Sequence, residues 1–578
     1  MNTAHRSLVA ALTAHSRSDP DRRAFVFLSP DGSEEMVLTF GELCCRARLL
    51  SKEIRNSTKS GDRVLLAFPP GLEFVVAFIG CLYAGAIAVP VVLPRRNKVL
   101  DATRSIIADC DPKLAMTTVP QGPPLKLIFE ESLGIDYLPI LTVDLTQSQA
   151  RVPVHLGSED ICDIDEIAFL QYTSGSTSTP KGVVVSHGNL SANLEMITDA
   201  YKLDRSSTRV GWIPLHHDMG LIFNVLQACY CGALCVLMAP MSYLKQPLLW
   251  LRAIDKYRAI LALGTNSSYQ HCVDTVGFVA SSGLDLSSWK LAITGAEPVR
   301  WETMRAFGDK FGRCGFDMNA FHPGFGMAEA TLVITGGRFA RGPRLHRADS
   351  AALRRDIVAG SDVAEALTHV GCGRAMPGEE VAIVDPVSLV RKTNLAVGEV
   401  WVKGKNVARG YWKNPKATNN SFCGLIKGET DANWLRTGDL GYLEDDGELF
   451  ITGRLKDMII VRGENHYPQD IEYTAEKAAT SLRKDYGAAF SVVCGGSEFV
   501  VLVYEVKKSM MGRLDDAEVC RDIRQAVLRE HGISLHDCVL VKAGTVPKTT
   551  SGKIRRSRVS ELWRHGLLVP VSHKRFMS

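Results

Sequence analysis

The 578-residue sequence predicts an α/β protein with a large N-terminal domain and a small, mobile α+β C-terminal domain. Short apolar runs alternate with helical patterns over the first 330 residues, which is typical of parallel sheets covered by helices. From Gly373 onward the runs are split by Gly, Pro and Asp turns, which predicts a small barrel-like antiparallel unit. A new apolar run follows Arg454, so we expect the domains to span 1–455 and 456–578.

The positions of the apolar runs along the sequence predict where the strands lie. In the large domain we expect strands at 63–68, 114–118, 167–171, 210–214, 233–238, 259–263 and 290–294. The longest apolar run, 74–89, is too short for a membrane span, so it predicts a buried helix leading into a buried strand at 87–93. Further strands are expected at 381–384, 398–403, 448–452 and 458–461.

The composition and the net charge are those of an ordinary globular protein. Hydrophobic residues make up 46% and charged residues 22%, which is ordinary for a globular protein, and the net charge of +4 gives no indication of nucleic-acid binding. The whole excess lies beyond residue 456, where 19 Lys and Arg face 15 Asp and Glu. Residues 555, 556, 558 and 564 are all Arg, and they predict either a solvated basic face or a docking surface for an acidic partner.

The fifteen cysteines form no pair of Cys-x-x-Cys elements, so no structural zinc site is predicted. Cys229, Cys231 and Cys235 lie in an apolar stretch and are interpreted as core residues. An odd count without a signal-like leader predicts a reducing, cytoplasmic setting without stable membrane insertion.

The most informative segment is 172–182, Tyr-Thr-Ser-Gly-Ser-Thr-Ser-Thr-Pro-Lys-Gly. Apolar runs flank it, so it predicts a loop between two strands, and residues 186–189 then predict a helix cap. Its backbone N–H groups, hydroxyls and Lys181 suit phosphate binding. Pro180 stands where a Walker loop has its second Gly, so this is not a Walker loop. For such a run alone, a plain surface loop stays open as the alternative.

Five further segments follow in order: 211–222, 295–298, 324–331, 434–442 and 547–555. Each is weak alone, but together with 172–182 they resemble the adenylate-forming superfamily of acyl synthetases and luciferase-like enzymes over nearly the whole chain. Residues 453–472, the His-Asp-Met-Gly-Leu-Ile run at 217–222 and an extra stretch at about 337–367 resemble the fatty acyl-AMP ligases in particular. The alternative for the extra stretch is an ordinary surface loop.

The resemblance implies a set of site residues and the cofactors ATP and Mg²⁺. Binding of the β- and γ-phosphates is implied for Thr173, Ser174, Gly175, Ser176 and Thr177, with Lys181 adding a movable charge. Glu329 is implied as the magnesium ligand, and Asp439, with Arg454 beside it, as the acceptor for the ribose hydroxyls. The residues implied around the adenine are Gly295, Ala296, Glu297, Phe325, Gly326, Met327 and Ala328.

Two catalytic positions and a hinge complete this implied site. Lys553 would reach in from the small domain to the attacking carboxylate and the α-phosphate, while Lys456 would be the hinge. His217 matches the family's pocket-gate position, because His216 stands where Tyr is common. Phe325 also replaces a usual Tyr, which keeps ring stacking and loses a hydroxyl contact. Some of residues 212–222 and 241–250 are candidates for the acyl tunnel, and the alternative for the apolar residues there is core packing.

The implied reaction is attack of a fatty acid on ATP, giving acyl-AMP and pyrophosphate, followed by acyl transfer to a phosphopantetheine thiol. The sequence shows no Asp-Ser-Leu carrier motif, so we expect a separate acyl carrier protein as partner, docked on the basic stretch, in bacterial lipopeptide or polyketide assembly. One alternative is a fatty acyl-CoA synthetase. Another is an inactive acyl- or nucleotide-binding protein, against which the retention of Lys553, Glu329, Asp439 and Lys181 argues.

Overall fold

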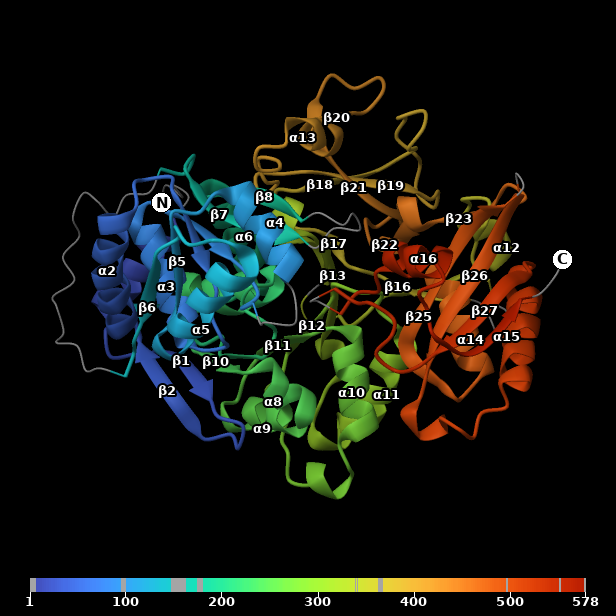
Figure 1. Ribbon diagram of the computed structural model, residues 1–578, viewed down its shortest axis with the longest axis horizontal. Coiled ribbons are helices and arrows are strands. Elements are labelled where there is room, and N and C mark those ends of the chain that lie inside the picture. The colour runs from blue at the N-terminus through green and yellow to red at the C-terminus, as the bar shows by residue number, and fades with distance from the viewer. Residues whose placement is uncertain are drawn as a thin grey trace.

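The computed structural model describes residues 7–94, 100–146, 163–173, 180–337, 339, 341–361, 367–494, 497–549 and 552–575. A large α/β domain occupies one side of the molecule, a β unit lies above its centre, and a small α+β domain lies at the other side (Figure 1). The predicted fold class is therefore confirmed, with separate sheets for each part.

The first sheet has six strands in the order β6-β5-β3-β4-β7-β8. These are β3 (Arg63–Leu66), β4 (Ile87–Pro90), β5 (Leu114–Thr118), β6 (Ile140–Val143), β7 (Ile167–Thr173) and β8 (Lys181–Ser186). All neighbours are parallel except β7 and β8, which pair antiparallel. Helix α3 (Leu72–Ala84) is buried along nearly its whole length before β4, which confirms the predicted buried helix and strand.

The second sheet has nine strands in the order β17-β14-β13-β12-β11-β9-β10-β1-β2. These are β1 (Arg23–Leu28), β2 (Glu34–Thr39), β9 (Arg209–Gly211), β10 (Cys235–Met238), β11 (Leu261–Gly264), β12 (Leu291–Thr294), β13 (Phe321–Gly326), β14 (Val333–Gly336) and β17 (Arg374–Ala375). The central pairings from β1 to β13 are parallel, and only the edge pairings are antiparallel. Strand β9 ends at Gly211, earlier than predicted.

Helices cover both sheets. Those of the large domain are α1 (Leu8–Ser18), α2 (Phe40–Ser57), α3, α4 (Leu100–Cys110), α5 (Gly122–Leu127), α6 (His187–Tyr201), α7 (Gln227–Cys231), α8 (Pro240–Lys245), α9 (Leu248–Lys256), α10 (Asn266–Thr275), α11 (Trp301–Phe311), α12 (Ser350–Leu353) and α13 (Pro415–Phe422). The predicted cap at 186–189 is confirmed, because Ser186 and Asn189 form a reciprocal capping box at the start of α6. No helix in the described part of the chain is long and apolar enough to cross a membrane.

The β unit contains β18 (Glu380–Val384), β19 (Gly398–Lys403), β20 (Gly424–Leu425), β21 (Ala432–Leu443) and β22 (Leu449–Arg454), all paired antiparallel. The predicted insertion contains β15 (Leu345–Ala348), which pairs antiparallel with β16 (Leu367–Val370) at its end. Strand β15 contacts the β unit through His346, whose Nδ1 lies 2.8 Å from Oε1 of Glu444 and whose ring lies 5.5 Å from that of Tyr442.

The small domain begins with the hairpin β23 (Ile459–Val461) and β24 (Glu464–His466). Its sheet has the order β25-β26-β27-β28, with β25 (Leu482–Cys494), β26 (Ser497–Val506), β27 (Leu535–Val541) and β28 (Pro570–Arg575). The helices are α14 (Pro468–Ala478), α15 (Asp516–His531) and α16 (Arg556–Arg564). It has its own apolar core, so it can move as a unit.

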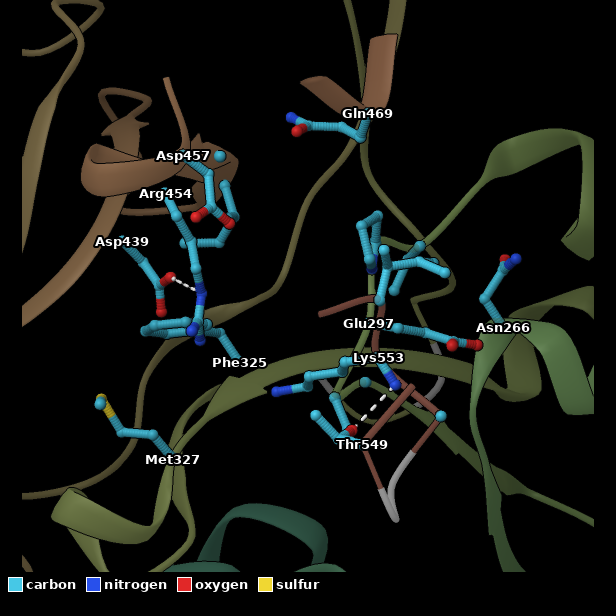
Figure 2. Close-up of a pocket in the computed structure, with 18 of the residues that line it drawn as sticks. Asn266, Glu297, Phe325, Met327, Asp439, Arg454, Asp457, Gln469, Thr549 and Lys553 are labelled. Atoms are coloured by element: carbon cyan, nitrogen blue, oxygen red, sulfur yellow. Dashed lines mark hydrogen bonds and ion pairs between the residues drawn. The ribbon is translucent and has the colours of Figure 1, made fainter. Parts of the chain in front are cut away.

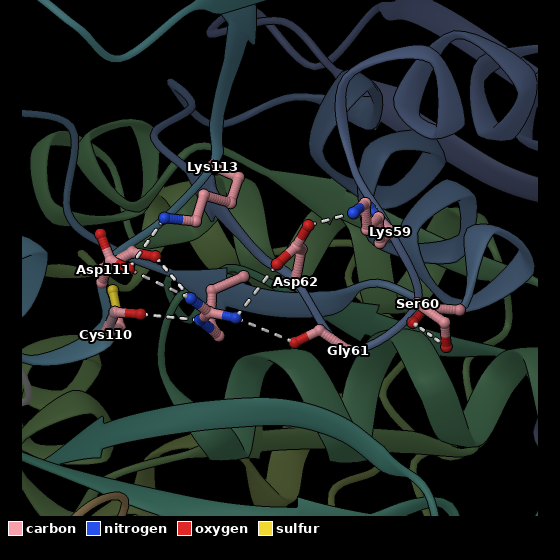
Figure 3. A network of polar contacts seen from close by, with 9 residues as sticks. Lys59, Ser60, Gly61, Asp62, Cys110, Asp111 and Lys113 are labelled. Carbon is pink, nitrogen blue, oxygen red and sulfur yellow. Dashed lines mark hydrogen bonds and ion pairs between the residues drawn. The ribbon is translucent and has the colours of Figure 1, made fainter.

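A polar network ties the start of β3 to the end of α4 (Figure 3). The Arg63 guanidinium donates from Nε to the carbonyl of Cys110 at 2.8 Å and from Nη2 to that of Asp111 at 2.8 Å. It also donates from Nη1 to Gly61 at 3.1 Å. One side chain thus satisfies carbonyls that the end of α4 leaves without helical partners.

An aromatic cluster under the second sheet gives a stability prediction. Trp289 is fully buried, and its ring lies 5.1 Å from Trp250 and 5.2 Å from Phe316. We expect Trp289→Ala to lower the free energy of unfolding by about 3–5 kcal/mol, because it removes buried area and leaves a cavity. Urea denaturation measures this loss. The exposed Tyr137→Ala is the control, expected to change stability by less than about 0.5 kcal/mol, and equal losses in both would contradict the assignment of Trp289 to the core.

Candidate active site

A cavity of about 1660 Å³ lies between the large and small domains. Fifteen of the predicted site residues line it: Thr173, Lys181, His217, Gly295, Ala296, Glu297, Phe325, Gly326, Met327, Ala328, Glu329, Asp439, Arg454, Lys456 and Lys553. Ser174, Gly175, Ser176 and Thr177 lie outside the described residues. The motifs are far apart in the sequence, yet the fold brings them to one place.

The ends of two parallel strands build one wall of the cavity. Gly295 follows β12 and Phe325 lies near the end of β13, so both stand at the carboxyl edge of the second sheet, where α/β proteins commonly bind ligands. A Cβ on Gly295 would lie only 2.7 Å from the carbonyl oxygen of Gly324, so the close approach of these two segments requires glycine. Ala296 adopts a left-handed backbone conformation with φ of 67°, which marks a constrained turn.

Glu297 is anchored at this wall, and the backbone N–H of Ser267 donates to its carboxylate. Burial raises the pKa of Glu297, while that hydrogen bond and the nearby Lys548 oppose the rise. Glu297 and Asn266 lie on one side of the cavity, and Asp439 and Arg454 lie on the other (Figure 2).

Tyr411, which the sequence motifs did not indicate, contacts both Lys181 and Glu329 at one end of the cavity. Thr173 and Lys181 are paired across the β7–β8 hairpin. The ammonium of Lys181 lies 4.8 Å from the centre of the Tyr411 ring, and the Tyr411 hydroxyl donates to Oε1 of Glu329 at 2.8 Å. Tyr411 thus contacts Lys181 with its ring face and Glu329 with its hydroxyl. Nothing in the sequence around 411 distinguishes this Tyr from a core residue.

Glu329 fits the predicted magnesium role. It is almost fully buried, and burial raises the pKa of its carboxyl while the Tyr411 hydroxyl opposes that rise. Among the described residues no group of three or more His, Cys, Asp and Glu could form a protein cage for a metal. Mg²⁺ is usually bound by one or two protein carboxylates and takes its other ligands from substrate phosphates and water, so a single carboxylate such as Glu329 fits this role.

Asp439 and Arg454 face each other across β21 and β22, and Nε of Arg454 lies 2.8 Å from Oδ1 of Asp439. The pair is asymmetric, because Asp439 is buried while Arg454 is 40% exposed. The charge of Asp439 raises the pKa of Arg454 although burial opposes it. The arrangement leaves a fixed carboxylate at the cavity wall that can accept hydrogen bonds.

His216 and His217 both line the cavity, so the structure does not favour one over the other as the gate. Burial and the neighbouring His217 lower the pKa of His216 to about 4, which makes it neutral near pH 7. Nδ1 of His217 lies 2.7 Å from Oδ1 of Asp218, and although burial opposes it, His217 lowers the pKa of that carboxyl. His217 is therefore the one of the two with a carboxylate partner.

The assignment of an acyl tunnel stays a prediction. Residues 216–219 line the cavity, but none of 241–250 does. Tyr243 instead stacks on Trp212 with ring centres 3.9 Å apart, and Trp250 is fully buried in the second core. Tyr243 and Trp250 therefore pack in a core, whereas Met241 and Leu244 are exposed.

Lys553 extends from the small domain into the cavity (Figure 2). Its loop is closed by two hydrogen bonds: its N–H donates to Oγ1 of Thr549 at 3.0 Å, and the Thr549 N–H donates to its carbonyl at 2.8 Å. Burial and Arg454 lower the pKa of Lys553, while Asp439, Asp218 and Glu329 oppose this. The ammonium of this small-domain residue thus lies among charged groups of the large domain.

Lys456 lies in the short 3₁₀ turn Leu455–Asp457 between β22 and β23, at the passage from one domain to the other. Burial and the nearby Arg454 lower the pKa of Lys456.

The prediction that Arg556 lies on an exposed basic face is wrong. Its guanidinium is held by both oxygens of Glu472 at 2.7 Å, and Nη1 lies 3.5 Å from Asp457, so Arg556 fastens the segment after the hinge to α14.

Comparison with known proteins gives matches along the whole chain. The family model described as AMP-binding enzyme matches residues 12–412, and the model described as Disco-interacting protein 2-like, AMP domain, matches 456–572. The medium-chain-fatty-acid–[acyl-carrier-protein] ligase JamA of Moorena producens is 37% identical over 97% of this chain and 96% of its own. The long-chain-fatty-acid–AMP ligase FadD32 of Mycolicibacterium smegmatis is 32% identical, over 97% and 95%.

The solved structures give the same result. The crystal structure of a fatty acid AMP ligase from Legionella pneumophila is 36% identical and covers 99% of this chain and 98% of its own, with a TM-score of 0.73. The order of the motifs, their position around one cavity and the extent of these matches all indicate the same family. The chain therefore belongs to the AMP-binding enzymes and, within them, to the fatty acyl-AMP ligases.

Proposed function

We propose that the protein activates a fatty acid with ATP to acyl-adenylate and then transfers the acyl group to the phosphopantetheine thiol of a separate acyl carrier protein. The observation that carries the first step is the position of Lys553, whose loop from the small domain enters the cavity that holds Asp439, Arg454 and Glu329. This placement supports the proposal that the small domain is docked here in the position that adenylation needs.

In the proposed first step this chain supplies position and charge. Phe325 and the 295–297 segment bind the adenine, and Asp439 accepts hydrogen bonds from the ribose hydroxyls. Lys181 and Thr173, with the 174–177 loop, hold the outer phosphates. Magnesium, held by Glu329 and the phosphates, adds positive charge when bound. Lys553 stands between the fatty carboxylate and the α-phosphate, where negative charge accumulates as the new bond forms and pyrophosphate leaves.

The choice of acceptor rests on the relatives and on the insertion. JamA is named as a ligase acting with an acyl carrier protein. In this chain the insertion also contacts the small domain: Nε of Arg354 lies 3.2 Å from Glu464, and Nδ2 of Asn465 donates to Oδ1 of Asp356 at 3.0 Å. Such contacts would restrain the small domain and favour a carrier thiol over free CoA.

An acceptor assay tests this choice. We expect pyrophosphate release with fatty acid and ATP, then rapid transfer to a phosphopantetheinylated carrier protein and at least about tenfold slower transfer to CoA, since only the carrier offers a docking surface. Equal rates with CoA would make the protein an acyl-CoA synthetase. Absence of pyrophosphate release would make it an inactive binding protein. The apo carrier, which lacks the thiol, is the control.

A further inference from the structure

A charged contact between the two domains has no part in the mechanism above, although Arg300 and Asp485 also line the cavity. Arg300 precedes α11 of the large domain, and its backbone N–H donates to Oδ1 of Asn266 at 3.0 Å. Its guanidinium reaches the small domain. Nη1 lies 3.4 Å from Oε1 of Glu476, and Nη2 lies 3.0 Å from Oδ1 of Asp485. The same group lies 4.5 Å from the centre of the Tyr473 ring.

The small domain presents a fixed receptor for this guanidinium. Oε2 of Glu476 accepts the hydroxyl of Tyr504 at 2.9 Å and the backbone N–H of Asp485 at 2.9 Å. Tyr504 is part of the small domain's own core, so Glu476 is held by contacts that do not involve the large domain. Asp485 has a φ of 59°, a left-handed conformation that Asp tolerates and that sets its side chain beside Glu476.

The contact is also shielded from solvent. The side chain of Arg300 is 20% exposed and that of Glu476 is 11% exposed. Although burial alone would lower the pKa of Arg300, Asp485 and Glu476 raise it above its ordinary value. Losing one partner would therefore leave the other charges buried and uncompensated whenever the domains are docked.

The receptor is linked to the loop that carries Lys553. Tyr486 follows Asp485, and the ammonium of Lys548 lies 3.4 Å from the centre of its ring. Lys548 also pairs with Ile554 in a β-bridge, so these two residues enclose the Lys553 turn. Docking through Arg300 and placement of Lys553 thus share one structural unit.

We propose that Arg300 is a positioning residue that latches the small domain in its adenylating position; this rests on the proposed function. Arg300 lies three residues beyond Glu297 of the adenine wall, so the latch joins the nucleotide pocket directly to the small domain. The domain rotation that precedes acyl transfer would break this contact in every cycle. Weakening the contact between Arg300 and the small domain should therefore slow adenylation and leave acyl transfer unchanged.

The test uses Arg300→Gln, Asp485→Asn and their combination in the full-length protein. We expect each single change to slow formation of acyl-AMP from fatty acid and ATP by roughly 10- to 100-fold, with transfer from supplied acyl-AMP to the carrier unchanged. The double variant should lose little more than the worse single one, because both changes break the same contact. Arg300→Lys should recover part of the rate, since it keeps the charge and loses the planar fork. The control is Arg258→Gln, which removes an exposed ion pair to Asp285 and should alter neither step.

Small-angle X-ray scattering of the ligand-free protein gives a readout that does not depend on activity. Arg300→Gln should increase the radius of gyration, and Arg258→Gln should not. If the wild type makes no acyl-AMP but Arg300→Gln still increases the radius, the proposed function fails and the latch stands. The latch is overturned if Arg300→Gln adenylates at the wild-type rate, if both half-reactions fall equally, or if the scattering is unchanged.

Discussion

Lys553→Ala is expected to reduce the rate of acyl-AMP formation by about 10²–10³-fold, the usual loss when a charge aimed at a transition state is removed. Transfer from supplied acyl-AMP to the carrier should be affected much less, because in the proposed mechanism the small domain takes this loop out of the cavity before transfer. Pyrophosphate release measures the first step, and a carrier loading assay measures the second. Lys542→Ala, an exposed lysine of the same domain, is the control and should change neither rate.

The pH dependence gives an independent check on Lys553. Burial and Arg454 lower its pKa, so its charge is lost at a lower pH than that of an ordinary lysine. The adenylation rate should therefore fall as pH rises through this lowered pKa, and the alanine variant should lack this alkaline limb. Equal loss of both half-reactions in Lys553→Ala, or an unchanged alkaline limb, would show that Lys553 acts on the fold or on binding in general.

Lys456→Pro is expected to retain acyl-AMP formation and to lose acyl transfer, on the order of 100-fold, the loss that misplaced reacting groups produce. Lys456 lies in the 3₁₀ turn between β22 and β23, and the φ of such a turn is compatible with proline in the adenylating position. Fixing φ should prevent the rotation that brings the thiol to the acyl-AMP. The two half-reactions are measured separately.

Lys456→Ala is the matched control for this change, because it removes the ammonium from the cavity and leaves the backbone free. If it loses transfer to the same extent as Lys456→Pro, the side chain matters and the hinge does not. A proline variant with wild-type transfer would rule out rotation at this position. Thermal unfolding of both variants shows whether either change disturbs the fold.

The sequence determined the fold class and most of the site, because both depend on local patterns. Alternating apolar runs place the parallel strands wherever the sheet is buried on both faces, and the capping box at Ser186 and Asn189 is a short-range signal. The site residues Lys181, Glu329, Asp439 and Lys553 lie in motifs whose order along the chain can be recognised without knowing any distance. The boundary at Lys456 and the roles of these residues stay predictions.

Only the tertiary structure decided which side chains contact one another. Tyr411 sits between Lys181 and Glu329, and Arg300 reaches Glu476 across 176 positions of the sequence, so neither pairing leaves a local pattern. Arg556 illustrates the same limit of prediction from sequence, because its surroundings in the sequence predict an exposed side chain and the structure pairs it with a carboxylate. Four nearby arginines suggest an exposed basic face, but whether an arginine is solvated or held by a carboxylate depends on which helix packs beside it, and here Glu472 of α14 does. Such contacts are set by the three-dimensional packing of distant segments, which the sequence pattern does not encode locally.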